Sequence, residues 1–159
     1  MVGTPRDTIR LQTRRATDVA NEQALAPDAT AVARYARLRA PTVWKQRRGA
    51  VGVYNCFGLV WANRRTAIYE ESELLKILAD DGYRSIPVAE IDLGDVALYR
   101  TEQLGILHVA IVVRLDPVGT TIVPWLLSKW ADWSGEDFHS AYDVPNYWRP
   151  FSLEWWTDR

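Results

Sequence analysis

Hydrophobic positions recur with the period of a helix in the first half of the chain and in strand-like blocks in the second half. A first helix is predicted after Pro27, where Asp28 or Thr30 can serve as its cap. Pro41 ends this helix, because the residue before a proline avoids the helical region.

Two more helices are predicted in the middle of the chain. After Cys56, the apolar residues Leu59 and Val60 follow at i+3 and i+4, so one helix begins at or near the cysteine and runs to about residue 66. Another fits Glu71 to Asp81, with Gly82 as its stop. The acidic residues at its start suit the positive end of the helix dipole.

Strands are predicted in the second half. The apolar run that ends at Arg114 begins at residue 104 or 105 and is apolar on both faces, which is typical of a central strand. Asp116 to Gly119 is predicted as a tight turn, and residues 120–130 as the next strand. Pro124 interrupts that strand and indicates an edge or a bulge. A shorter strand covers residues 96–100.

The length of 159 residues fits one domain with a sizeable core. Residues 1–27 show no firm period, and we interpret them as a loosely held arm ahead of a single domain at residues 28–159. The net charge of −1 divides unevenly, with +6 on residues 1–50 and −7 on residues 51–159. A basic arm can bind nucleic acid. Because no nucleic-acid motif is present, we favour a basic segment beside an acidic body and expect no nucleic-acid partner.

Composition excludes several classes of protein. A single cysteine excludes an internal disulfide framework and zinc sites built from several cysteines, and we predict neither a metal nor a cofactor. The longest apolar run, Ile106 to Val113, is too short to cross a bilayer, so no membrane association is expected. The first residues contain no secretory signal, which makes the cytoplasm the default location, although delivery by other machinery would leave the same sequence.

The candidate chemistry centres on Cys56. At a helix N-terminus, the dipole and the unpaired N–H groups favour an anion and bias a thiol toward thiolate. His108, fifty-two positions later in the middle of the predicted central strand, is the candidate base. Strand alternation predicts that His108 shares a face with Ile106, Ala110 and Val112. The alternative is that Cys56 and His108 are ordinary core residues.

Two residues are candidates to orient the base. With the turn at Asp116 to Gly119, His108 faces Leu127, and one extra turn or bulge residue brings Ser128 opposite instead. His139 can replace Ser128 as orienter or line the site, and its alternative is an exposed loop histidine. Tyr54 and Asn55 directly precede the cysteine and are candidates to line a substrate cleft. The backbone N–H of Cys56 is the candidate oxyanion donor.

Three motifs carry a family resemblance. Asn55-Cys56-Phe57-Gly58-Leu59-Val60 resembles the cysteine motif of NlpC-type, papain-like cysteine peptidases and amidases. Residues 93–99, LGDVALY, resemble the Gly-Asp turn that leads into a strand in that family, and residues 107–112, LHVAIV, resemble its histidine strand. The motifs come in the order of the family and cover about half of the chain, roughly residues 53–129.

The resemblance implies an α+β fold with a papain-like core, in which the nucleophile helix packs on a small antiparallel sheet. It also implies a cysteine hydrolase, a peptidase or amidase, that cleaves an amide bond, often in bacterial cell-wall peptides. Cys56 would be the nucleophile, His108 the base and Ser128 the third member. The family usually has His, Asn or Gln at that third place, and Phe57 stands where the family often has serine.

Three alternatives stay open. The same pair can act as an acyltransferase or as a deamidase, because both reactions use an acyl-cysteine intermediate. A third possibility is a catalytically weak or inactive module that binds a peptide or a glycan through the aromatic residues of the C-terminal part. In each case the predicted partner is a peptide-like substrate or ligand.

Overall fold

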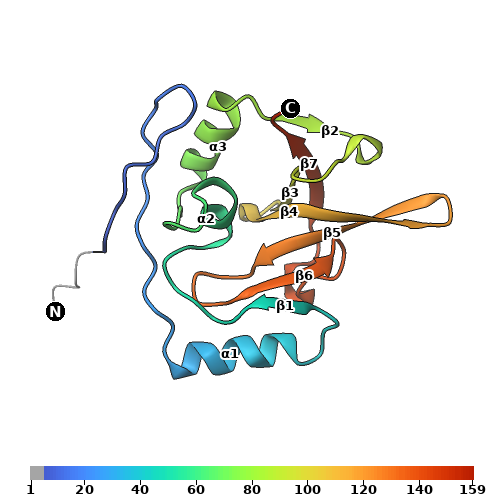
Figure 1. The fold of residues 1–159 in the computed structure, drawn as a ribbon, viewed down its shortest axis with the longest axis horizontal. Coiled ribbons are helices and arrows are strands. Elements are labelled where there is room, and N and C mark those ends of the chain that lie inside the picture. Colours follow the sequence, from blue (N-terminus) through green and yellow to red (C-terminus); the bar gives the residue numbers. More distant parts are fainter. Residues whose placement is uncertain (1–5) are drawn as a thin grey trace.

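Seven strands form one antiparallel sheet with three helices beside it in the computed structural model, which describes residues 6–159 without the side chain of Tyr147 (Figure 1). The order across the sheet is β1-β6-β5-β4-β3-β7-β2. The helices are α1 (Ala29–Arg39), α2 (Cys56–Trp61) and α3 (Glu71–Asp80). The strands are β1 (Lys45–Arg48), β2 (Arg84–Ile86), β3 (Val96–Thr101), β4 (Gly105–Val118), β5 (Thr121–Lys129), β6 (Glu136–Ser140) and β7 (Ser152–Thr157).

This architecture contradicts the predicted papain-like core. The sheet dominates the molecule, and the helix that begins at Cys56 has only six residues instead of reaching residue 66. It stops early because Asn63 and Arg64 adopt positive φ angles of 46° and 65°, which a right-handed helix does not contain. The pattern also missed β1, whose four residues are all exposed and polar, so no hydrophobic alternation marks it.

The other two helices confirm their predictions within a residue or two. Asp28 caps α1, and its side chain accepts a hydrogen bond from the Ala31 N–H. Helix α3 ends at Asp80, and Gly82 follows with a φ of +79°. No helix within residues 6–159 combines the length and the apolar character that crossing a bilayer requires.

The hairpin of β4 and β5 projects from the sheet (Figure 1). The predicted turn at Asp116 to Gly119 is wrong by about two residues, because Asp116 and Pro117 still pair with β5 and the chain turns after Val118. A bulge is present as predicted, but it lies between Val112 and Arg114 on β4 and not at Pro124.

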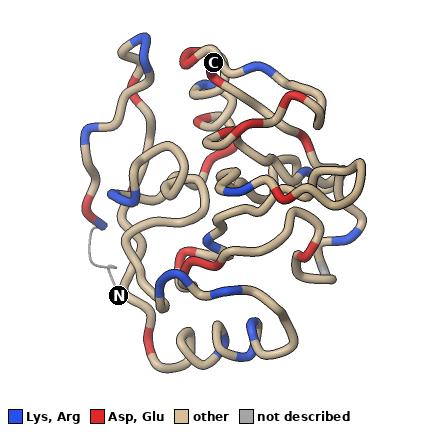
Figure 2. The backbone as a smooth tube through the Cα atoms, turned by 45° about the vertical axis from the view of Figure 1, so that its right-hand side comes forward, with Lys and Arg blue, Asp and Glu red and all other residues tan. Residues whose placement is uncertain are grey.

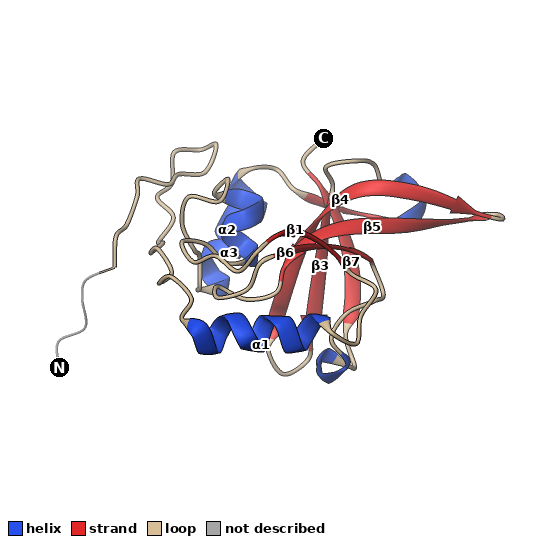
Figure 3. Cartoon of the chain, turned by 60° about the horizontal axis from the view of Figure 1, so that its bottom comes forward, coloured by secondary structure: helices blue, strands red, loops and turns tan. Residues whose placement is uncertain are grey.

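Alternate residues of the sheet face opposite sides, and the two larger buried clusters lie on different sides. Val96, Leu98 and Val109 pack with α2 and α3 on one face, which we call the α2 face. Their neighbours along the strands, including Ala97 and Ala110, pack with Tyr35 of α1 and several tryptophans on the other face, the α1 face. In Figure 3, α2 and α3 lie together and α1 lies apart from them. This division decides which candidate residues can meet.

The predicted N-terminal arm is described from Arg6 onward, and residues 1–5 lie outside the described part. Leu11 and Val19 are buried in the core of the α2 face, and the Thr13 hydroxyl donates to Asp80 at 2.9 Å. Lys and Arg residues of the basic N-terminal third are frequent along α1 and β1 (Figure 2). Two of them meet buried carboxylates, since Arg39 pairs with Asp137 and Arg47 with Glu136.

Candidate functional site

Cys56 lies at the first position of α2, as predicted, but in a closed environment. Asn55 caps the helix by accepting from the Gly58 N–H at 2.9 Å. The thiol is 7% exposed and packs in the core of the α2 face. Burial raises the pKa of Cys56 to about 12, although backbone N–H groups of Val109 and Phe57 act in the opposite direction. The thiol is therefore protonated at neutral pH.

Cys56 and His108 lie on opposite faces of β4. Val109 packs in the same core as Cys56, and consecutive side chains of a strand point to opposite faces. The His108 ring accordingly lies among aromatic rings on the α1 face, with its centroid 5.4 Å from that of Trp130. No hydrogen bond joins the Cys56 sulfur to the His108 ring in the described structure. This geometry offers no direct proton transfer from the thiol to the imidazole, and the Cys–His hydrolase stays a prediction that the arrangement does not favour.

His108 instead contacts Ser128, one of the two candidate orienters, and reaches the other, His139, through it. The Ser128 Oγ lies 2.9 Å from Nε2 of His108 and 2.7 Å from Nε2 of His139. The three residues come from the neighbouring strands β4, β5 and β6. His139 is thus a buried strand residue and not an exposed loop residue. The sequence-predicted group is brought together without its nucleophile.

Hydrogen-bond chemistry fixes the direction of this chain. Nδ1 of His139 lies 2.8 Å from the Ser140 carbonyl, which only accepts, so Nδ1 carries the proton. In a neutral imidazole, Nε2 of His139 is then an acceptor, and the Ser128 hydroxyl donates to it. The Ser128 oxygen, which keeps its lone pairs, accepts from Nε2–H of His108.

Burial keeps both imidazoles neutral. His108 is 1% exposed, and Ser128 and His139 are fully buried. Burial lowers the pKa of His139 to about 4, and it lowers the pKa of His108 well below its usual value, with His139 adding to the effect. Tyr99, Trp130 and Trp148 enclose the His108 ring, at centroid distances of 4.9 to 5.6 Å. In this conformation His108, Ser128 and His139 form a hydrogen-bonded network in the core rather than an open reaction centre.

Tyr54 and Asn55 do not line a cleft. The Tyr54 hydroxyl donates to Glu136 at 2.5 Å, and both residues are buried. The Asn55 amide donates to the Ile68 carbonyl at 2.5 Å, and its oxygen accepts from the Ile68 N–H at 3.2 Å. Asn55 therefore joins the start of α2 to the loop before α3, which is a structural role.

The residues that the sequence reasoning missed are buried charges. Glu136 is fully buried and accepts from Arg47 and Arg64, at 2.6 and 2.7 Å. Although burial raises it, these contacts and the Tyr54 hydroxyl lower the pKa of Glu136 to about 2. Lys129 is fully buried and donates to two backbone carbonyls, and burial lowers its pKa to about 8.

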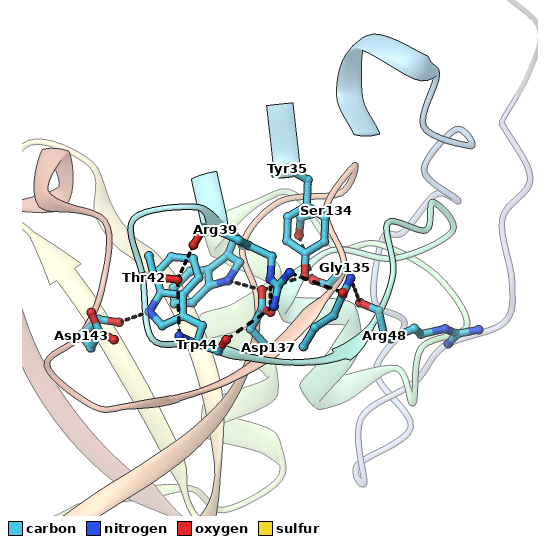
Figure 4. A network of polar contacts seen from close by, with 11 residues as sticks. Tyr35, Arg39, Thr42, Trp44, Arg48, Ser134, Gly135, Asp137 and Asp143 are labelled. Atoms are coloured by element: carbon cyan, nitrogen blue, oxygen red, sulfur yellow. Dashed lines mark hydrogen bonds and ion pairs between the residues drawn. The ribbon is translucent and has the colours of Figure 1, made fainter. Parts of the chain in front are cut away.

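Asp137, the residue after Glu136 on β6, is a second buried carboxylate and lies on the α1 face (Figure 4). Its carboxylate accepts from the Tyr35 hydroxyl, from Nε of Arg39 and from Nε1 of Trp130, at 2.7 to 2.9 Å. These bonds tie α1 to the sheet, because Tyr35 is the one buried residue of that helix. A Glu-Asp pair in sequence looks like a solvated turn, and no pattern marked it as buried.

Open space lies at a different place. A hollow of about 440 Å³ separates the turn after β3 from the segment that leads into β7. It is lined by Arg100, Thr101, Glu102, Gln103, Leu104, Leu107, Trp148, Arg149, Pro150, Phe151 and Ser152. A second hollow of about 740 Å³ is lined by Tyr142, Leu153 and the same residues 149–151. The segment Arg149–Phe151 therefore forms a ridge between two adjoining hollows.

Trp148 lies between the first hollow and the buried group of His108, Ser128 and His139. Its ring contacts His108 at a centroid distance of 4.9 Å and also lines the hollow. Within residues 6–159, no three His, Cys, Asp or Glu side chains gather closely enough to hold a metal ion. Comparison of the chain with known protein families, with curated proteins and with solved structures finds no match.

Proposed function

We propose that this domain binds a peptide-like ligand in the two adjoining hollows around Arg149–Phe151. The observation that carries the proposal is the shared ridge, which places both hollows on one continuous surface. The volume of the first hollow lies in the range of small-ligand pockets, about 300–1,000 Å³. A ligand that crosses the ridge contacts both hollows at once.

The chemistry of the walls suits a peptide better than a glycan. Leu104 and Tyr142 expose 67% and 58% of their surface beside the hollows, and the turn adds the polar side chains of Thr101, Glu102 and Gln103 to the first hollow. A peptide offers apolar side chains and amide groups that can contact both kinds of surface. A glycan is typically held between several open aromatic faces, whereas Tyr142 is the one exposed aromatic residue in the described lining of the hollows and Trp148 is only 8% exposed.

Equilibrium dialysis of the protein against a pool of short synthetic peptides tests the proposal. Mass spectrometry identifies the peptides that the protein retains. Leu104→Ser should weaken the retained peptides about tenfold, because the variant removes an apolar contact of more than 1 kcal/mol. Leu75→Ser is the matched control, since Leu75 is an exposed leucine of α3 outside both hollows. Retention of no peptide, or equal effects of the two variants on the retained peptides, would contradict peptide binding here.

The same assay reports turnover. A peptide that is cleaved by the wild-type protein and left intact by Cys56→Ala would support the Cys–His hydrolase of the sequence analysis. We expect binding without cleavage, because the thiol is protonated and separated from His108 by the strand.

A further inference from the structure

Two opposite charges line the first hollow from different segments. Glu102 belongs to the turn after β3, and Arg149 belongs to the segment before β7. They form no ion pair with one another, and within residues 6–159 neither has an oppositely charged side chain within 4.0 Å. The hollow thus presents one acid and one base that the protein itself does not neutralise.

The third charge of the hollow is already matched. Nε of Arg100 lies 3.1 Å from Glu154, and its NH1 lies 3.5 Å from Glu71. Arg100 therefore supplies less free positive charge to a ligand than Arg149 does. Arg149 is exposed and is held in place by the protein: its guanidinium lies over the Phe151 ring at 5.5 Å and donates to the Tyr142 carbonyl at 3.3 Å. Its remaining N–H groups are available to an anion.

Apolar side chains line the same hollow as the two charges. Leu107, Trp148 and Phe151 contribute to the lining of the hollow, and Leu104 lies at its exposed margin. This arrangement is complementary to a molecule that carries a cation at one end, an anion at the other and an apolar group between them. A short peptide with two free ends has this pattern, whereas an internal segment of a long chain lacks both charges.

We infer that the ligand is a short apolar peptide with free termini, whose carboxylate binds Arg149 and whose ammonium group binds Glu102. This inference rests on the proposed function, since it names the ligand class of the same hollow. Charge-assisted hydrogen bonds are the stronger ones, so each terminus contributes to both affinity and orientation. Because Glu102 and Arg149 both line the first hollow, its volume of about 440 Å³ limits the stretch between the two termini to a few residues, whose side chains can extend over the ridge into the second hollow.

An apolar tripeptide in four forms tests the inference by calorimetry: free at both ends, N-acetylated, C-amidated and blocked at both ends. Acetylation of the N-terminus and amidation of the C-terminus should each weaken binding to the wild-type protein about tenfold. Arg149→Gln should remove the effect of amidation and keep that of acetylation, and Glu102→Gln should do the reverse. Arg114→Gln and Glu90→Gln are matched controls, since both lie outside the hollow, and both should keep the two effects.

The outcomes separate the inference from the proposed function. If the blocked peptide binds as tightly as the free one, the inference is wrong while peptide binding stands. If no form binds, the proposed function fails together with the inference. Thermal unfolding of each variant checks that it is folded, and Arg149→Lys, which keeps the charge, should keep the preference for a free carboxylate.

Discussion

The Ser128 hydroxyl lies 2.7 Å from Nε2 of His139 and donates its single proton to it. The same oxygen accepts from His108, so one hydroxyl on β5 bonds to two buried imidazoles, one on the strand at each side of it. Backbone pairing between β4 and β5 runs from Val118–Thr121 to Ile111–Leu127. The hydrogen bonds that join His108, Ser128 and His139 lie just beyond the last of these pairs. We interpret them as a connection that holds β4, β5 and β6 together where the ladder between β4 and β5 ends.

Ser128→Ala should destabilise the protein by about 2–4 kcal/mol, because it leaves a buried donor on His108 and a buried acceptor on His139 without partners. Urea unfolding followed by tryptophan fluorescence measures the change. Ser85→Ala, at an exposed serine of β2, is the control and should stay within about 0.5 kcal/mol of wild type. A Ser128→Ala protein as stable as that control would show that these two hydrogen bonds contribute nothing to the stability of the fold.

Stability should fall as the pH is lowered from about 7 to 5. The unfolded chain takes up protons on histidine below pH 6.5, whereas the pKa of His139 in the folded state is about 4. Over this interval the unfolded state binds more protons, so its free energy falls relative to the native state. His139 alone should account for about 2 kcal/mol, and His108 acts in the same direction.

The comparison of wild type with His139→Asn isolates this effect. Denaturant unfolding at several pH values should give a shallower slope for the variant, even if the variant is less stable throughout. Glu136 does not interfere in this interval, because its pKa is lowered to about 2 and its contribution is lost only at more acidic pH. An unchanged slope would mean that folding does not lower the pKa of His139.

Local signals predicted part of this arrangement. Asp28, Pro41 and Gly82 mark helix ends through their own backbone chemistry, so α1 and α3 could be located from the sequence. The proximity of His108 and Ser128 was predicted, but the hairpin pairing used to predict it was wrong. Ile111 pairs with Leu127, because the chain turns later than predicted, and the Ser128 hydroxyl reaches His108 from this different register. Such features depend on neighbours along the chain or across one turn.

The face of the sheet that each residue occupies was harder to predict. Alternation placed His108 with Ala110 and Val112, which is correct, and with Ile106, which is wrong. A register shift next to Tyr99 offsets the alternation between Ile106 and His108. The position of α2 depends on packing between distant segments, and no local pattern says which face its first residue meets. The hollow was missed for the same reason, since segments near residues 102 and 149 form it together.

Asn55→Ala should be among the most damaging single changes near α2. The variant loses the cap on Gly58 and both bonds to Ile68, in a buried environment, and we expect a loss of about 3 kcal/mol. Asp28→Ala removes the exposed cap of α1 and should cost about 1 kcal/mol. Chemical denaturation of both variants gives the comparison. Equal losses would argue against the structural role assigned to Asn55.

Cys56 should resist a thiol-specific disulfide reagent in the native protein at pH 7. A thiol pKa of about 12 leaves a thiolate fraction roughly a thousandfold below that of an unperturbed cysteine, and burial restricts access further. The rate should rise sharply when the protein is denatured. Leu75→Cys in a Cys56→Ala background provides an exposed reference thiol on α3, which should react at an ordinary rate. Rapid native labelling with a midpoint near neutral pH would instead indicate an activated thiolate and would make the cysteine hydrolase the better account of the site.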